Sequence, residues 1–160
     1  MPSPDPAAPS AIAHPDIRLR AVLDADLPVF FEHQRDPAAA RMAAATPATR
    51  REHTDLWRTL RADPTATGRT IVVDDVVAGA ITCWERWGER QVGYWLGRDH
   101  WGRGVATTAL ALFLAEMTTR PVHAYVAPHN TASQRVLDKC GFRPDGVDGG
   151  DTLLGYVLEA

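Results

Sequence analysis

The clearest candidate for chemistry in this sequence is a glycine-containing turn between an expected strand and an expected helix. The stretch Gln91 to Met117 begins with residue types that favour strands, and from Val105 onward its apolar residues recur at helical spacing: Leu110, Phe113, Leu114 and Met117. Gly102 and Gly104 lie just before the first helical turn, whose N–H groups have no internal partner and carry partial positive charge. Backbone without side chains admits a ligand closely, so the turn predicts an anion site, most naturally for phosphate.

Two familiar phosphate loops do not fit this turn. The mononucleotide loop ends in Gly-Lys-Ser/Thr, whereas Gly104 is followed by Val105 and Ala106. The dinucleotide fingerprint needs a third glycine, and Thr107 stands at that position. The remaining pattern is W-G-R-G-V-A, and a turn that merely joins a strand to a helix stays open as the alternative.

A second motif follows in the C-terminal third of the chain. After an expected strand, Val122 to Val126, the segment 129–142 reads H-N-T-A-S-Q-R-V-L-D-K-C-G-F. Asn130 is a good helix N-cap, Gly141 suits the left-handed residue after a helix, and Phe142 suits the apolar contact that accompanies it. One face of this helix is expected to carry Ser133, Val136, Leu137 and Cys140.

Together the two motifs resemble the GNAT superfamily of N-acetyltransferases over roughly residues 17 to 158. The family's coenzyme A loop reads Q/R-x-x-G-x-G/A, and Gly104 and Ala106 match its last two positions. Trp101 replaces the usual Gln or Arg, and with G-Y-W-L-G before it this resembles the RimJ/RimL branch. The later family pattern N-x-x-S-x-R-V-L-x-K-x-G-F is matched by Asn130, Ser133, Arg135, Val136, Leu137, Lys139, Gly141 and Phe142.

The resemblance implies an α+β fold with a mixed sheet. Six to seven strands, mostly antiparallel, form a twisted sheet that is splayed at its centre and flanked by about four helices. Strands are expected at Ile17–Val22, Thr70–Val73, Val76–Trp87, Gln91–Leu96, Val122–Val126 and Thr152–Leu158, the last pairing with a strand that begins near Phe142. Residues 36–47 are expected to form a loop or broken helix, and residues 145–151 a flexible acidic turn.

Two helices are expected before the glycine turn. Asp24 or Asp26 caps the first, which runs to about Gln34. The second starts at the capping box Thr49-Arg50-Arg51-Glu52 and runs to about Arg61. Its apolar stripe is expected to comprise His53, Leu56, Trp57 and Leu60.

Length and composition bound the class of protein. A chain of 160 residues suits one domain: a disordered Pro/Ala-rich tail over residues 1–16 and a single acetyltransferase domain over residues 17–160. It lacks an 18-residue apolar run, and its net charge of −3 disfavours nucleic-acid coating. Cys83 and Cys140 are expected to be buried thiols, and the six histidines lack metal-ligand spacing. A cytoplasmic protein without a metal, membrane or nucleic-acid partner is expected.

The activity that the resemblance implies is transfer of an acetyl group from acetyl-CoA to a primary amine of a small molecule or of a peptide or protein N-terminus. The amine attacks the thioester directly in a ternary complex. Pantetheine is expected along the strand edge at Tyr94, Trp95 and Leu96, where an N–H near Trp95 polarises the acetyl carbonyl. The remaining cofactor-binding residues are expected to be Arg98, Gly102, Arg103, Gly104, Val105, Ala106, Thr107, Asn130 and Ser133.

Proton transfer is assigned to two side chains. In RimJ/RimL-like enzymes, a serine at the position of Ser133 is proposed to protonate the departing thiolate, and water is the alternative. The family's base is often a glutamate two residues before G-Y, where this chain has Gln91. Glu85 is the best substitute, followed by Glu89 and Asp151, and water is again an alternative.

Other interpretations stay open at this level. Because Gln91 lacks a carboxylate, a non-catalytic domain that binds and senses CoA is compatible with the same motifs. An unrelated α+β binding module is the third reading. The tryptophans Trp57, Trp84 and Trp87 either line the acceptor cleft or belong to the core. The acceptor amine is not specified, and a homodimer is left open.

Overall fold

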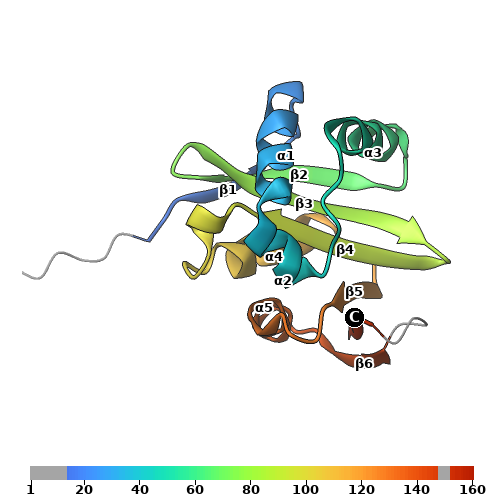
Figure 1. The fold of residues 1–160 in the computed structure, drawn as a ribbon. Helices are drawn as coiled ribbons and strands as arrows, with labels where there is room; N and C mark the ends of the chain where they lie inside the picture. Colours follow the sequence, from blue (N-terminus) through green and yellow to red (C-terminus); the bar gives the residue numbers. More distant parts are fainter. Residues whose placement is uncertain (1–13, 148–151) are drawn as a thin grey trace, which may run out of the picture.

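In the part of the chain that the structure describes, seven strands form a single sheet in the order β1-β2-β3-β4-β5-β7-β6 (Figure 1). The computed structural model describes residues 14–147 and 152–160. The strands are β1 Ile17–Arg20, β2 Thr67–Val73, β3 Val76–Arg86, β4 Glu89–Leu96, β5 Val122–Val126, β6 Arg143–Val147 and β7 Leu154–Leu158. The helices are α1 Leu27–Arg35, α2 Pro37–Ala43, α3 Arg50–Ala62, α4 Val105–Glu116 and α5 Thr131–Lys139, with short 3-10 turns η1 Asp24–Asp26 and η2 Arg98–His100. The predicted mixed α/β class is confirmed.

The sheet opens between its fourth and fifth strands. All other neighbouring strands are antiparallel, whereas β4 and β5 run parallel and pair only through Gln91 and His123. Beyond that pair, β4 continues to Leu96 with β3 alone as its partner. The edge of β4 that faces β5 therefore has backbone groups outside any ladder, and the predicted central splay is confirmed.

Helices cover both faces of the sheet, and each face has its own core. On one face α4 contributes Val105, Leu110 and Phe113, which are buried against residues such as Ile71 and Ile81 of the sheet. On the other face Phe30 of α1 and Trp57 of α3 pack with Ala80 of β3. Ala80 and Ile81 are adjacent in β3, so the alternation of a strand explains why they belong to different clusters.

Two predictions about the N-terminal helices are corrected. The segment 36–47 contains a regular helix, α2, because Asp36 accepts a hydrogen bond from the Ala38 N–H and Pro37 occupies the first helical position. In α3 the capping box of Thr49 and Glu52 is confirmed, but Leu56 is 51% exposed and lies outside the buried stripe. The buried face of α3, with His53 and Trp57, is therefore narrower than the predicted apolar stripe.

Strand boundaries differ modestly from those predicted. β1 ends at Arg20, before the predicted end at Val22. β2 begins at Thr67, three residues before the predicted start at Thr70. The β6–β7 hairpin is confirmed, although β6 extends into the expected acidic turn. Residues 148–151 of that turn, and residues 1–13 of the expected tail, lie outside the described residues.

Two further predictions concern cysteines and membranes. Cys83 and Cys140 are free thiols, and Cys83 is buried while Cys140 is half-buried. Within residues 14–147 and 152–160, no helix has the length and apolar character needed to cross a bilayer.

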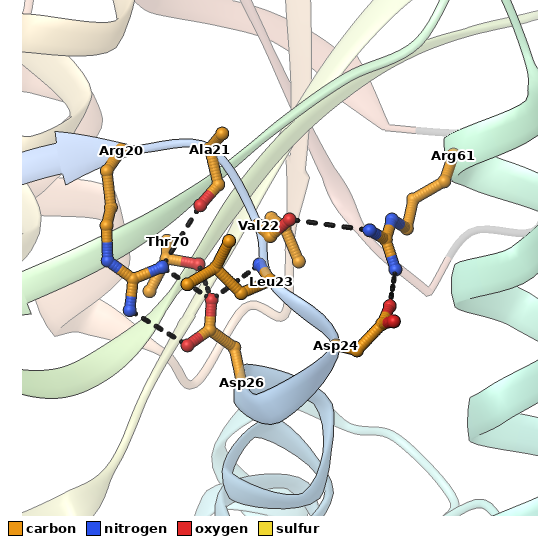
Figure 2. A network of polar contacts seen from close by, with 8 residues as sticks. All are labelled: Arg20, Ala21, Val22, Leu23, Asp24, Asp26, Arg61 and Thr70. Carbon is orange, nitrogen blue, oxygen red and sulfur yellow. Dashed lines mark hydrogen bonds and ion pairs between the residues drawn. The ribbon is translucent and has the colours of Figure 1, made fainter.

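A polar corner anchors β1 to η1 and β2. Figure 2 shows Asp26 accepting hydrogen bonds from Arg20, from the Leu23 N–H at 2.8 Å and from the Thr70 hydroxyl at 2.7 Å. The Asp26 side chain is only 4% exposed. These bonds, led by the one from Arg20, lower the pKa of Asp26 to about 2 despite its burial. Asp26, one of the two residues predicted to cap the first helix, is the N-cap residue of α1, but the predicted side-chain cap is wrong because no cap bond is made. Its carboxylate instead bonds to the residues of the corner.

Candidate functional site

A cavity of about 390 Å³ lies where β4 and β5 separate. Its walls come from α2, the end of β4, the glycine turn, the first turn of α4 and one face of α5. Ten of the residues expected to bind the cofactor line it: Tyr94, Trp95, Leu96, Gly102, Gly104, Val105, Ala106, Thr107, Asn130 and Ser133. Residues far apart in the sequence are therefore brought to one cavity of a size typical of small-molecule sites.

The glycine turn leaves the amino terminus of α4 open. Gly102 and Gly104 have φ angles of 72° and 73°, in the left-handed region that disfavours side chains. Apart from the two adjoining residues, no described residue has an atom within 4 Å of the position that a Cβ would take at either glycine. Gly104 is the N-cap and provides no side-chain cap, and the first turn contains no acidic residue. The first N–H groups of α4 are consequently available to an anion.

Two cations of α5 border the same cavity. Arg135 and Lys139 lie one helical turn apart, both are exposed, and both line the cavity. Among the residues that the structure describes, neither has an ion-pair partner. Their side chains thus supply positive charge near the uncapped helix. Both belong to the α5 motif, but sequence reasoning did not assign them to cofactor binding, since that needs the placement of α5 beside α4.

The two arginines that were expected to bind the cofactor lie elsewhere. Neither Arg98 nor Arg103 lines the cavity. Arg98 donates to Asp36, with its Nε 2.7 Å from Asp36 Oδ2, and so ties η2 to the N-cap of α2. Arg103 Nη2 lies 3.7 Å from Asp74 Oδ2 in an exposed pair, which is a weak interaction. Their role in cofactor binding stays a prediction.

Tyr94 and Ser133 meet inside the cavity. The Tyr94 hydroxyl lies 2.6 Å from Ser133 Oγ, and the Ser133 N–H donates to Asn130 Oδ1 at 3.1 Å. Burial raises the pKa of Tyr94 to about 12, although the bond to Ser133 lowers it. The predicted N-cap role of Asn130 is confirmed. The hydroxyl pair was missed because sequence reasoning treated Tyr94 only as a strand edge.

No carboxylate lines the cavity within the described part of the chain. Glu85 accepts a bond from Arg90 at 2.7 Å, and its side chain is 49% exposed. Glu89 accepts one from the Tyr125 hydroxyl at 2.7 Å, and Asp151 lies outside the described residues. Gln91 is buried at the one point where β4 pairs with β5. The assignment of Glu85 as a base stays a prediction.

The tryptophans divide between the core and the surface. Trp57 is buried, with its ring centroid 5.1 Å from that of Phe30, and Trp87 is 82% exposed. Trp84 packs over Gly93, where an added Cβ would lie 3.1 Å from its ring. None of the three lines the cavity. Trp95 and Trp101, which sequence reasoning did not consider as cleft tryptophans, do so.

Two histidines lie close to Gly97 and η2, and one of them lines the cavity. His100 lines the cavity, and His33 of α1 packs against Gly97. Burial is the main cause that lowers the pKa of both imidazoles, and each Nδ1 is buried without a hydrogen-bond partner in the structure described. Burial therefore favours the neutral form of both rings. No group of three or more potential metal ligands occurs within the described ranges.

Comparison with known proteins identifies the family. Residues 16–143 match the family described as Acetyltransferase (GNAT) domain. This match spans most of the chain, so the chain belongs to the GNAT acetyltransferase family.

Relatives agree with that assignment. An uncharacterized N-acetyltransferase p20 from Bacillus licheniformis is 26% identical over 144 residues, covering 82% of this chain and 81% of that protein. The spermidine N-acetyltransferase of Vibrio cholerae, solved with CoA and spermine, superposes with a TM-score of 0.77 at 16% identity over 89% of this chain and 95% of its own. RimJ of Mycobacterium smegmatis, solved with CoA-disulfide, gives 0.73 at 24% identity over 90% and 82%. These structures share the fold.

Proposed function

We propose that this protein transfers an acetyl group from acetyl-CoA to a primary amine of a small molecule or of a peptide or protein N-terminus, in a ternary complex. The observation that carries the proposal is the cavity beside the point where β4 and β5 separate. The uncapped amino terminus of α4 forms part of its lining. Membership of the GNAT family and relatives solved with CoA support an acyl-CoA cosubstrate.

The residues present suit the parts of coenzyme A. The backbone from Gly102 to Thr107 would hold the diphosphate, and Arg135 and Lys139 add charge from the opposite wall. Arg98 and Arg103 would have to leave their present carboxylate partners to contribute. The strand edge from Tyr94 to Leu96, which lacks a ladder to β5, would pair with the amides of pantetheine.

The reaction requires one bond to form and one to break. The amine nitrogen attacks the acetyl carbon, while a β4 N–H near Trp95 stabilises the negative charge on the carbonyl oxygen. The C–S bond then breaks and its electron pair remains on sulfur. The nitrogen loses one proton and the sulfur gains one, so the overall reaction is balanced. Ser133 faces the cavity and is the proposed hydrogen-bond donor to the departing sulfur, with Asn130 capping its helix, and water would deliver the proton that the sulfur gains.

The finer classification is part of the same proposal. The motif W-G-R-G-V-A and the preceding G-Y-W-L-G support the RimJ/RimL-like branch. We extend the proposal to a single catalytic domain over residues 17–160 that acts in the cytoplasm. Glu85, or water, would accept the proton of the amine.

A CoA-binding domain without catalysis is the second candidate. It is favoured by Gln91 at the family's glutamate position and by the lack of a carboxylate among the described residues that line the cavity. Acetyl transfer and non-catalytic binding both need the same CoA site, but acetyl transfer alone also requires turnover of acetyl-CoA.

An amine panel separates the two candidates. Purified protein is incubated with acetyl-CoA and, in turn, polyamines, aminoglycosides, amino acids and peptides with free N-termini, and the release of free thiol is measured. We expect amine-dependent release with at least one acceptor, and acetylated product by mass spectrometry. Stoichiometric CoA binding without turnover on any acceptor would instead establish the non-catalytic domain.

A further inference from the structure

We propose that Tyr94 is a positioning residue whose phenol donates a hydrogen bond to Ser133 Oγ and so directs the Ser133 hydroxyl toward the thioester sulfur. This inference rests on the proposed acetyl transfer, because it concerns the sulfur of acetyl-CoA. It adds a function for the Tyr94 side chain, which lies on the same strand whose backbone was expected to pair with pantetheine.

The geometry fixes Ser133 from two sides. Tyr94 comes from β4 and Ser133 from α5, and their hydroxyl oxygens lie 2.6 Å apart within the cavity. On the backbone side, Asn130 Oδ1 accepts from the Ser133 N–H at 3.1 Å. The Tyr94 hydroxyl also lies 3.4 Å from the Ser133 carbonyl oxygen, which is a longer and weaker contact. Among the residues that the structure describes, Tyr94 is the one partner of Ser133 Oγ, at 2.6 Å. The contact distance is that of a strong O–H···O hydrogen bond.

Relative acidity decides which hydroxyl donates. A phenol is a stronger acid than an aliphatic alcohol, and therefore the better hydrogen-bond donor. Burial raises the pKa of Tyr94 to about 12, so its proton stays in place at neutral pH. When Tyr94 donates to Ser133 Oγ, the serine's own hydrogen is left to point into the cavity. The two hydroxyls then form a chain whose members polarise one another.

This chain stabilises charge at the sulfur without consuming a proton of its own. As the C–S bond breaks, its electron pair stays on sulfur, and the Ser133 hydroxyl donates a hydrogen bond to the developing thiolate. The proton that the amine nitrogen releases balances the one that the sulfur finally gains. Tyr94 keeps its proton, since an ordinary thiol has a pKa of about 8.5 and its thiolate is too weak a base to take it.

Four variants test the proposal by kcat and by the Kd for CoA. We expect Tyr94→Phe and Ser133→Ala each to lower kcat about tenfold while the Kd changes less than twofold. The double variant should be no slower than the slower single variant, because both remove the same interaction. Tyr156→Phe, which alters a buried phenol that does not line the cavity, should keep kcat within twofold. Wild-type kcat in Tyr94→Phe, or losses that multiply in the double variant, would overturn the proposal.

Replacing Tyr94 by a fluorinated tyrosine provides a second test. It should change the pH dependence of kcat only if Tyr94 donates a hydrogen bond to Ser133, and not if Tyr94 has a purely structural role. Site-specific 3,5-difluorotyrosine at position 94 keeps the ring and hydroxyl but ionises at lower pH. We expect kcat near wild type at neutral pH and a loss of kcat at alkaline pH that wild type lacks, because the ionised phenol no longer donates. A pH profile identical to that of wild type would contradict the proposal.

The role of Tyr94 and the proposed acetyl transfer can be refuted separately. Turnover by wild type with an unaffected Tyr94→Phe variant would remove only the role of Tyr94. No turnover by wild type on any amine would remove the proposed acetyl transfer, and the positioning role with it.

Discussion

The polar corner around Asp26 and the cavity between β4 and β5 treat polar groups in opposite ways. At the corner, a nearly inaccessible carboxylate is bonded to Arg20, Thr70 and a backbone N–H (Figure 2). At the cavity, the first N–H groups of α4 have no side-chain cap, and the edge of β4 beyond Gln91 does not pair with β5. Polar groups whose hydrogen bonds are made within the protein stabilise the fold, whereas polar groups without such partners are available to a ligand. Variants at the corner should therefore alter stability, and variants at the cavity should alter CoA affinity.

Asp26→Asn should have the largest effect. The amide keeps the size of the side chain but loses the charge that Arg20 and Thr70 are arranged around. We expect the free energy of unfolding, measured by urea denaturation, to fall by about 3 kcal/mol, with CoA affinity unchanged. Asp24→Asn is the matched control, since Asp24 is exposed and its one ion pair among the described residues is with Arg61; it should cost under about 1 kcal/mol. Equal losses in both variants would contradict the role of the corner.

The same carboxylate predicts a dependence on pH. Folding lowers the pKa of Asp26 from 3.8 to about 2, so its stabilisation is present above pH 4 and is lost as the pH falls toward 2. The difference in unfolding free energy between wild type and Asp26→Asn should shrink by about 2 kcal/mol over that range. Denaturation curves at several pH values measure it, and a constant difference would refute the assignment.

Ala106→Glu should separate stability from binding. Ala106 lies in the first turn of α4 and lines the cavity, so a carboxylate there favours the helix but repels a diphosphate. We expect CoA affinity to fall about 30-fold, or about 2 kcal/mol, with unchanged or slightly raised thermal stability. Thr108→Glu adds the same charge at an exposed position that does not line the cavity, and should bind CoA nearly as wild type does. Similar affinities in both variants would count against diphosphate binding at the amino terminus of α4.

Removing the two cations of α5 should have the smallest effect. Arg135→Gln combined with Lys139→Gln is expected to weaken CoA binding about tenfold at low salt, and less at high salt, because exposed charges are screened. As a control, Arg143→Gln removes one positive charge from an exposed pair with Glu159, and should leave affinity unaffected. Calorimetric titrations at two ionic strengths measure this, and an effect of Arg143→Gln as large as that of the double variant would remove the assignment.

Local signals explain which parts of the fold were predictable. The Thr49–Glu52 capping box, the Asn130 cap and Gly141 after α5 are short-range features, and all three behave as predicted. At the end of α5, the Phe142 N–H bonds to Leu137 O and the Gly141 N–H to Asp138 O, as that glycine implies. α2 was not identified because its alanines show no apolar periodicity.

Contacts between distant segments explain what the sequence did not reveal. The pairing of Tyr94 with Ser133 depends on how β4 meets α5, and the ion pair of Arg98 with Asp36 joins segments 62 residues apart. Glu85 was chosen by its place in a strand, but its partner Arg90 follows from the β3–β4 register. The motifs predict a cofactor loop, whereas proton-transfer roles require the packed structure.

Calorimetric titration of the wild-type protein with CoA tests the central claim most directly. The open amino terminus of α4 and the separated strands β4 and β5 predict saturable binding of one CoA per chain, with competition by acetyl-CoA. The absence of binding at millimolar CoA would contradict both the site and the acetyl transfer built on it.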